Sequence, residues 1–342
     1  MVLVHREATP SVLLSVILFF VYNFAFSGLG QLTTNLTMTA GLLMLYYARK
    51  EPIECNSVII IFSMGICLAS VLALLKSSLP IVNSFVNDVM LKVGDRSYAT
   101  RFSGLQGNPN YYTMDIIIAL SGIIVLMNKG ERNAMYTCLF ILLSVFGLMS
   151  VSKSFLIALV LLLFCWFWLS IRQGAGKLLR FAFAIVVSSA IAYYFAFDSI
   201  SSYIYRLIGD ISGTMGSITT GRTNVWQVYI KEIWDDFGIF LFGSGLNSMG
   251  VSERGTHNTY LECMFYLGIV GTTLFLLSLR TSMGRIITEK IMWVPVGLLL
   301  VRMVAIGIVT YDNLWFYLLV ILTLAKECKG SHDDPSHIGG RL

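Results

Sequence analysis

Apolar residues follow one another in long runs over most of the chain, and short polar or glycine-rich segments separate the runs. A helix of about 20 apolar residues crosses the ~30 Å hydrocarbon core of a bilayer. By this criterion the pattern predicts ten spans, at residues 11–28, 31–48, 56–75, 112–128, 134–151, 154–170, 181–197, 259–279, 291–310 and 313–325. The second contains the polar stretch QLTTNLT, and the last is short.

One segment between the spans has a different periodicity. Val225, Tyr229 and Ile233 recur at i, i+4 and i+8, which predicts a surface helix over residues 222–237. Arg222 would stand in the first turn of this helix, where a cation opposes the helix dipole and weakens the helix slightly. That position favours a role for Arg222 other than helix stability.

The composition indicates a membrane protein. Of the 342 residues, 56% are hydrophobic and 13% are charged, whereas soluble domains carry about 25% charged residues. We therefore expect an all-α polytopic membrane protein, with residues 1–342 forming a single integral membrane domain. No small-residue cleavage site separates VLVHREATPS from the first apolar run, so we expect that run to remain as a span.

The motifs of several common enzyme classes are missing. The chain has no GxGxxG, no Walker A sequence and no HExxH, which excludes the usual nucleotide-binding, dinucleotide-binding and zinc-protease sites. The six cysteines lie in or beside apolar segments without a zinc-binding spacing. We interpret them as small buried side chains.

Positive charge predicts the orientation of the spans. Cytoplasmic loops carry an excess of Lys and Arg, and this rule places both termini in the cytoplasm, including the tail 326–342. Two long loops then lie outside, at 76–111 and, between spans seven and eight, at 198–258. The outward-facing basic residues are Lys76, Lys92, Arg96, Arg101, Lys153, Arg206, Arg222, Lys231 and Arg254. They are either ordinary solvated charges or a binding surface for an anionic, lipid-attached substrate.

The first outer loop contains a candidate phosphate-binding arginine. Arg101 precedes a glycine-rich turn, and Asn108-Pro109-Asn110 is a turn signal that delivers Tyr111 and Tyr112 to the membrane interface. Tyrosines at such positions are common interfacial anchors. Arginine suits a phosphate clamp because its guanidinium binds phosphate with two parallel hydrogen bonds.

A second outward-facing cation lies in the tight junction between the fifth and sixth spans, in the sequence SVSKS. Lys153 there has two interpretations. A lysine at bilayer depth usually faces a wet, protein-lined cavity. Alternatively its long side chain extends to the outer interface.

The only histidine within the predicted membrane body is His257, in the stretch THNTYLECMFYLGIVG. An unperturbed imidazole has a pKa of about 6.5, so a useful fraction is neutral near pH 7 and accepts a proton. His257 would be a general base, an orienting contact for substrate, or an inert interfacial side chain. Glu253 and Glu262 are alternatives that would orient the ring or act as the base. On a helix, Glu262 would lie about 140° around the axis from His257, so the two would not share a face.

Four of these segments, taken in order, resemble the O-antigen polymerase and O-antigen ligase superfamily (Wzy and WaaL types). They are RFSGLQGNPN, SVSKS, TGRTNVWQ with LFGSGLNS, and THNTYLECMFYLGIVG, and the resemblance covers residues 97–317, including an outer Asp312. It implies a GT-C-type membrane glycosyltransferase with about ten transmembrane helices and a large periplasmic loop between spans seven and eight. It also implies transfer of a glycan from undecaprenyl diphosphate, with inversion and without metal or nucleotide cofactor.

The resemblance implies roles for individual residues. Arg101 and Arg222 match arginines that bind the diphosphate, and His257 matches the proposed base. Where many relatives have Ser-Arg, this chain has Ser152-Lys153, and lysine keeps the charge but loses the bidentate fork, which weakens the case for a phosphate contact there. We add a set of neighbouring substrate contacts to these positions: Asn110, Tyr111, Asn258 and Tyr260.

The resemblance covers two activities that differ in the acceptor. A polymerase attacks with the terminal sugar of a second lipid-linked repeat unit, and a ligase attacks with the lipid A-core sugar. Compact loops and the greater number of polymerases favour polymerase. The expected partners are lipid-linked donor and acceptor glycans, membrane lipid and, as a candidate, a chain-length regulator protein, with no nucleic acid. The expected location is the bacterial inner membrane, with the active site facing the periplasm.

A transporter or lipid flippase is the alternative from another class. Polar residues within the spans, such as Asn23, Asp115 and Arg302, permit it. Against it, the chain has no internal repeat and no matching pair of Gly- or Pro-broken spans. The polar residues outside the spans also concentrate on one side, which favours an active site that opens at the membrane surface.

Overall fold

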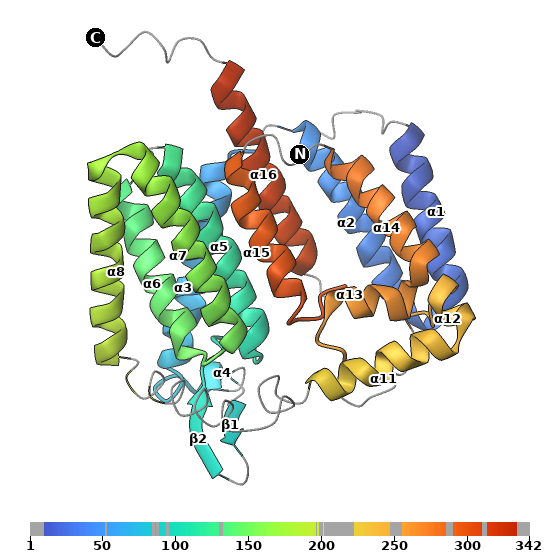
Figure 1. The fold of residues 1–342 in the computed structure, drawn as a ribbon, viewed down its shortest axis with the longest axis horizontal. Coiled ribbons are helices and arrows are strands. Elements are labelled where there is room, and N and C mark those ends of the chain that lie inside the picture. Colours follow the sequence, from blue (N-terminus) through green and yellow to red (C-terminus); the bar gives the residue numbers. More distant parts are fainter. Residues whose placement is uncertain are drawn as a thin grey trace. The chain divides into compact units, whose positions relative to one another are not determined.

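The computed structural model describes residues 10–51, 53–83, 86, 89–93, 96–129, 133–195, 197, 201, 222–246, 255–284, 290–309 and 313–333. The chain divides into two compact units. Unit 1 comprises Met1–Glu54, Gly221–Lys290 and Met303–Leu342, and unit 2 comprises Cys55–Thr220 and Ile291–Arg302. Figure 1 labels the helices and strands of both units.

Unit 1 is built from helices of both ends of the chain. Its elements are α1 (Pro10–Ser27), η1 (Leu29–Gln31), α2 (Leu32–Lys50), α11 (Arg222–Asp235), α12 (Phe237–Phe242), α13 (Thr259–Glu262), the π-helical turn η2 (Cys263–Leu267), α14 (Gly268–Met283) and α16 (Asn313–Asp333). Helix α14 packs against α1 and α2, and α2 packs against α16. The α2–α16 contact is close because Gly41 leaves room for the Trp315 ring.

Unit 2 is organised around one central helix. Its elements are α3 (Cys55–Leu74), α4 (Pro80–Asn83), β1 (Val89–Val93), β2 (Arg96–Arg101), α5 (Pro109–Lys129), α6 (Asn133–Met149), α7 (Lys153–Gln173), α8 (Ala175–Phe195) and most of α15 (Trp293–Met303), which follows the short 3-10 turn η3 (Lys290–Met292). Helices α3, α6 and α7 pack around α5. Its apolar side chains are buried on every side, so α5 is the core of unit 2.

The sequence pattern places the helices well. A helix lies in each of the ten predicted segments. Within the described part of the chain, five helices are long and apolar enough to cross a membrane: Pro10–Ser27, Cys55–Leu74, Pro109–Asn128, Lys153–Ile171 and Thr259–Met283. Ala134–Met149 and Phe181–Ile191 are shorter apolar helices. The chain is therefore a helical, membrane-embedded protein.

Three local features differ from the predictions. Strands β1 and β2 form an antiparallel hairpin with an irregularity between Leu91 and Lys92, where we had expected loop. Helix α5 starts at Pro109, before the predicted residue 112, because the Asn108 side chain accepts the Asn110 N–H at 2.9 Å and caps it. The predicted span 291–310 is an α-helix only over Trp293–Met303.

The surface helix predicted at 222–237 is confirmed as α11, which ends at Asp235. Arg206, Glu253, Arg254 and Asp312, which entered the sequence interpretation, lie outside the described residues, as do parts of both outer loops and of the C-terminal tail.

Candidate functional site

A first cluster of polar side chains lies in unit 2, around Asn110 in the first turn of α5. Arg101, the last residue of β2, donates from Nε to the Ser150 carbonyl oxygen (3.1 Å) and from Nη2 to Asn110 Oδ1 (3.3 Å). The Ser152 hydroxyl donates to the same Asn110 oxygen at 3.2 Å. Arg101 is half-buried. The arginine predicted to clamp a phosphate is therefore held in place while part of it stays accessible.

Arg302 of α15 joins this cluster from the other side. Its guanidinium donates from Nη1 to Ser154 Oγ (2.5 Å), and from Nη2 to the Asn110 carbonyl oxygen (2.8 Å) and to Thr113 Oγ1 (2.9 Å). The side chain is fully buried. A buried guanidinium is costly unless hydrogen bonds compensate its desolvation. Arg302 therefore ties α15 to the first turns of α5 and α7.

The SVSKS junction that presents Ser152 is strained. Val151 has a φ of 50°, which is left-handed and unusual for a β-branched residue. Its side chain is fully buried, and its N–H donates to the Leu148 carbonyl oxygen at 3.2 Å. Residue 147 is a glycine, and the Phe155 ring occupies the space that a side chain there would need. The absence of that side chain allows the turn to close tightly. Strain of this kind is often found at functional sites.

Two helix N-termini belong to the same cluster. Asn110 is in the first turn of α5, and Ser152 holds the N-cap position of α7. Its hydroxyl does not cap α7 but instead bonds Asn110 Oδ1 and lies 3.2 Å from Ser154 Oγ. Lys153, the first residue of α7, is half-buried. Helix N-termini carry positive partial charge, so these two and the arginines together form a site suited to an anion.

The two tyrosines that follow Asn110 have different surroundings. Tyr111 is half-buried beside the cluster, as a substrate contact would be. Tyr112 is buried, and its hydroxyl lies 2.6 Å from Ser70 Oγ of α3. The prediction of an interfacial anchor is therefore wrong for Tyr112, because its ring fills the space that Gly104 leaves in unit 2.

A second group of candidate residues lies in unit 1, around the segment that follows α15. Arg222, the first residue of α11, donates from Nη1 to the Ala305 carbonyl oxygen at 2.8 Å. The Thr259 N–H and hydroxyl both donate to the Ile306 carbonyl oxygen, at 3.1 and 2.6 Å. Residues 304–309 are not helical, so their carbonyl groups lack the N–H partners that a helix would provide. Arg222 and Thr259 supply hydrogen bonds to two of them instead.

His257 projects from a backbone that is fixed on both sides. The Trp226 indole N–H donates to the Thr256 carbonyl oxygen at 2.9 Å. Asn258 caps α13 by accepting the N–H groups of Tyr260 (3.0 Å) and Leu261 (3.2 Å). Between them His257 has a φ of 47° and an exposed side chain. The fold thus holds the imidazole outward.

The predicted neighbours of His257 have distinct positions. Asn258 is buried and its side chain is occupied in capping, whereas Tyr260 is exposed. Because α13 begins at Thr259, His257 precedes the helix and the expected helical angle to Glu262 does not apply. Glu262 Oε2 accepts the Val309 N–H at 3.3 Å. Its carboxylate also lies against Gly307, where a side chain would collide with it.

The span that follows His257 is interrupted by the π-helical turn η2. Such a turn leaves carbonyl groups without their usual helical partners. Ser244 donates from its backbone N–H (2.8 Å) and its hydroxyl (2.9 Å) to the Phe265 carbonyl oxygen. The Gly245 N–H donates to the Tyr266 carbonyl oxygen at 3.1 Å. The LFGSG part of the long loop therefore completes the interrupted helix.

The candidate residues thus fall into two sets. Arg101, Asn110, Ser152 and Lys153 form one cluster in unit 2, and Arg222 and His257 lie around the 304–309 segment in unit 1. Sequence reasoning missed Arg302 as a member of the first set. An arginine inside an apolar helix is itself a signal of function, but the hydrogen bonds that place it depend on three segments distant in sequence.

Fixed guanidinium groups and helix N-termini can bind and stabilise a phosphate-type anion, and an exposed imidazole can accept a proton. The roles predicted for the individual residues remain predictions. Comparison with known proteins adds no relative: no protein-family model, no curated protein and no solved structure matches the chain.

Proposed function

We propose that the protein is a membrane glycosyltransferase that polymerises oligosaccharide repeat units carried on undecaprenyl diphosphate. The observation that supports this most is the convergence of Arg101 and Arg302 on Asn110, at the N-terminus of α5 and beside that of α7. Fixed donors with positive charge are what a departing lipid diphosphate requires. The proposal places the protein in the bacterial inner membrane with its active site facing the periplasm, in a GT-C-type fold of about ten spans.

The chemistry needs a leaving-group site and a base. In the proposed reaction, a hydroxyl oxygen of the acceptor sugar attacks the anomeric carbon of the donor. The bond between that carbon and the diphosphate oxygen breaks with inversion, and both electrons leave with the diphosphate. His257 takes the proton of the attacking hydroxyl. In unit 2, Arg101 and Lys153 bind the diphosphate, while Arg302 holds Asn110 and the α7 N-terminus in position. In unit 1, Arg222 has the diphosphate role that the resemblance implies.

The position of His257 supports its role as the base. The imidazole is exposed, and the backbone on both sides of it is fixed by Trp226 and Asn258. A positioned general base typically contributes about 10²–10⁴-fold to a rate.

The test is extension of synthetic repeat units on undecaprenyl diphosphate by purified protein in detergent, read as a ladder on a gel. We expect the wild-type protein to form the ladder without nucleotide. The informative substitutions are His257→Asn, which tolerates left-handed backbone but is no base, and Arg101→Gln. Both should lose the ladder and keep the wild-type unfolding temperature.

Lys231→Ala, on the exposed side of α11, serves as the control and should leave the ladder intact. A full ladder from His257→Asn would remove the base role. If the wild-type protein transfers the glycan only to lipid A-core, it is a ligase. If it moves the lipid across vesicles without joining sugars, it is a transporter.

A further inference from the structure

Helix α11 presents three different sectors around its axis. One sector packs on protein: Tyr229 and Ile233 are buried against Phe265 of η2. At 100° per residue, Ile230 and Trp234 lie together on the flank next to that sector, and both are exposed. The sector opposite the buried one contains the polar, exposed residues Asn224, Lys231 and Asp235. A helix with one side against protein and the other in water would need only a buried sector and a polar sector. The exposed apolar flank of α11 is therefore a feature to explain.

The exposed apolar flank continues through α12. Trp234 stacks on Phe240 with ring centroids 5.7 Å apart, and Phe240 stacks on Phe237 at 6.0 Å. Trp234 is 73% exposed and Phe237 is 69% exposed. We call Ile230, Trp234, Phe237, Phe240 and Phe242 the aromatic strip. Exposed apolar patches of this kind mark surfaces that contact another phase or another molecule.

The aromatic strip joins a face that lipid covers. Phe242 stacks on Phe26 in the last turn of α1, with centroids 5.6 Å apart and an interplanar angle of 5°. Helix α1 is long and apolar enough to cross the membrane, and its exposed flank includes Leu14, Ile17 and Val21. The strip therefore meets the end of this helix at Phe26, within unit 1.

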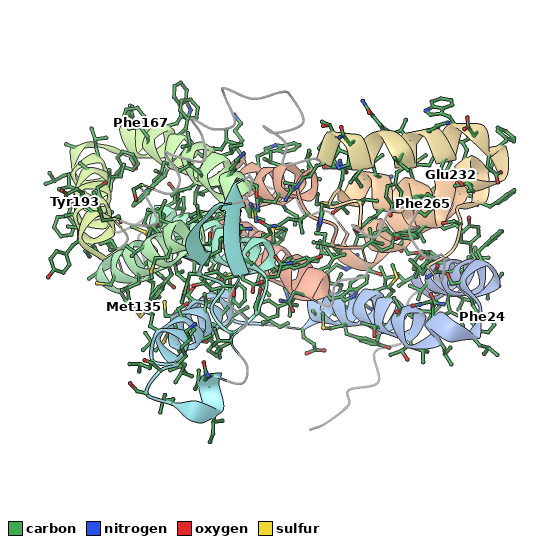
Figure 2. All side chains as sticks on the ribbon, turned by 90° about the horizontal axis from the view of Figure 1, so that it is seen from below. Phe24, Met135, Phe167, Tyr193, Glu232 and Phe265 are labelled. Carbon is green, nitrogen blue, oxygen red and sulfur yellow. The ribbon has the colours of Figure 1, made fainter. Side chains whose placement is uncertain are left out.

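The direction of α11 fits this surface. Figure 1 shows α11 running crosswise to α1 and α14, and Figure 2, seen from below, shows Glu232 on α11 labelled beside Phe265 of η2. Helix α11 packs on α12, α13 and η2. If α1 and α14 run along the membrane normal, α11 lies parallel to the membrane surface. Amphipathic helices with tryptophan and phenylalanine beside the polar face bind in this way at the headgroup boundary.

We infer that α11 and α12 rest in the lipid headgroup boundary of the bilayer, with the aromatic strip against lipid and the polar sector in water. The occupant of the strip is therefore lipid of the leaflet in which α1 ends. The inference has a consequence for depth in the membrane. Arg222 and Trp226 of α11 donate hydrogen bonds to the Ala305 and Thr256 carbonyl oxygens. The segments that contain Ala305 and Thr256 are therefore held at the same depth as α11. The inference does not depend on the proposed function.

The test uses the emission of Trp234 in the full chain, reconstituted in phosphatidylcholine vesicles. The difference between the wild-type protein and Trp234→Phe isolates that emission from the other five tryptophans, since the chain has six. We expect most of it to be lost in lipid brominated near the headgroup and less to be lost in lipid brominated at the chain ends. Acrylamide in the water should quench it little.

The matched control adds Lys231→Trp to the Trp234→Phe protein, which moves the reporter to the polar sector of the same helix. Its emission should be quenched by acrylamide and not by brominated lipid. Equal acrylamide quenching at the two positions would overturn the inference, since the strip would then face water. Protection of Trp234 from both quenchers would also overturn it, because protein rather than lipid would cover the strip.

Discussion

Val151 and His257 share a backbone conformation that few side chains adopt. Among the described residues other than glycine they are the two with positive φ, at 50° and 47°. Left-handed backbone costs an L-residue about 1–2 kcal/mol, and here tertiary contacts on both sides enforce it. Val151 lies next to the candidate residues Ser152 and Lys153, and His257 is itself a candidate residue. Backbone strain of this kind is usually retained at functional sites.

The strain at Val151 can be measured with a pair of substitutions. Val151→Gly and Val151→Ala both remove most of the buried side chain, but only glycine adopts a φ of 50° without cost. We expect both variants to be less stable than the wild-type protein, and Val151→Gly to be more stable than Val151→Ala by about 1 kcal/mol. The measurement is the thermal unfolding midpoint in detergent.

The control for this pair is Val145, a buried residue of α6 with ordinary helical backbone. There the order should reverse, since glycine in a helix is about 1 kcal/mol less stable than alanine. If Val151→Gly also unfolds below Val151→Ala, the backbone at Val151 is not strained in solution.

The buried guanidinium of Arg302 should not tolerate lysine. Arg302 reaches Ser154, Asn110 and Thr113 through two nitrogens, and the single ammonium of lysine cannot replace this fork. Arg302→Lys should therefore destabilise the protein by about 1–3 kcal/mol, the cost of leaving buried polar groups without partners. The control is Arg49→Lys. Arg49 donates one hydrogen bond of 3.1 Å to the Thr281 carbonyl oxygen, so we expect a smaller loss of stability there.

If Arg302→Lys and Arg49→Lys lower the unfolding midpoint equally, the three bonds of Arg302 contribute no more than the single half-buried bond of Arg49. If Arg302→Lys instead keeps the wild-type midpoint but loses glycan transfer, Arg302 acts on the substrate rather than on the fold.

At the scale of elements, the chain interrupts its helices where the candidate residues lie. Helix α13, the turn η2 and α14 divide one apolar run, and the segment after α15 leaves the helical path. In both places donors from elsewhere in unit 1 bind the carbonyl groups that the interruption releases. Irregular backbone within a membrane protein is tolerated only where protein or water satisfies it.

The junction between α12 and η2 depends on two glycines that face each other. Gly243 has a φ of 74°, and a side chain there would meet the backbone around Tyr266 and Gly268. A side chain at Gly268 would lie 2.6 Å from the Leu241 carbonyl oxygen. Gly243→Ala should therefore lower the unfolding midpoint strongly, because both the backbone conformation and the available space exclude it.

Gly65 of α3 provides the contrast, since a side chain there would meet open space. Gly65→Ala should leave the midpoint unchanged or raise it, as alanine is the better helix former. A wild-type midpoint for Gly243→Ala would show that α12 and η2 are farther apart than the structure places them.

The sequence predicts regular elements better than their interruptions, for a physical reason. Apolar runs decide where helices form, and the 3.6-residue period located α11 closely. The hairpin at Val89–Arg101, the π turn at Cys263 and the φ of His257 depend instead on tertiary partners, which no local pattern encodes. Of the site, residue types identified Arg101 and His257, whereas the contacts of Arg302 with Asn110 required the fold.

At the scale of the whole molecule, the orientation in the membrane follows from the positive-inside rule and is open to direct measurement. With alkaline phosphatase as a reporter, fusions within 76–111 and 198–258 should be active, because the enzyme folds only outside the cytoplasm. Fusions at Lys129 and in the 326–342 tail should be inactive, and green fluorescent protein fused there should fluoresce. Activity at Lys129 would reverse the orientation proposed for α5 and α6.

Helix α15 has a consequence for the surrounding bilayer. Its 11 residues are about 17 Å long at 1.5 Å per residue, whereas the hydrocarbon core is ~30 Å thick. Leu300 and Val301 are exposed on this short helix. Where lipid faces a helix of this length, its acyl chains have to shorten to match it, and such thinning costs elastic energy that grows with acyl-chain length. The thickness of the host membrane therefore becomes one of the variables that set the stability of the protein.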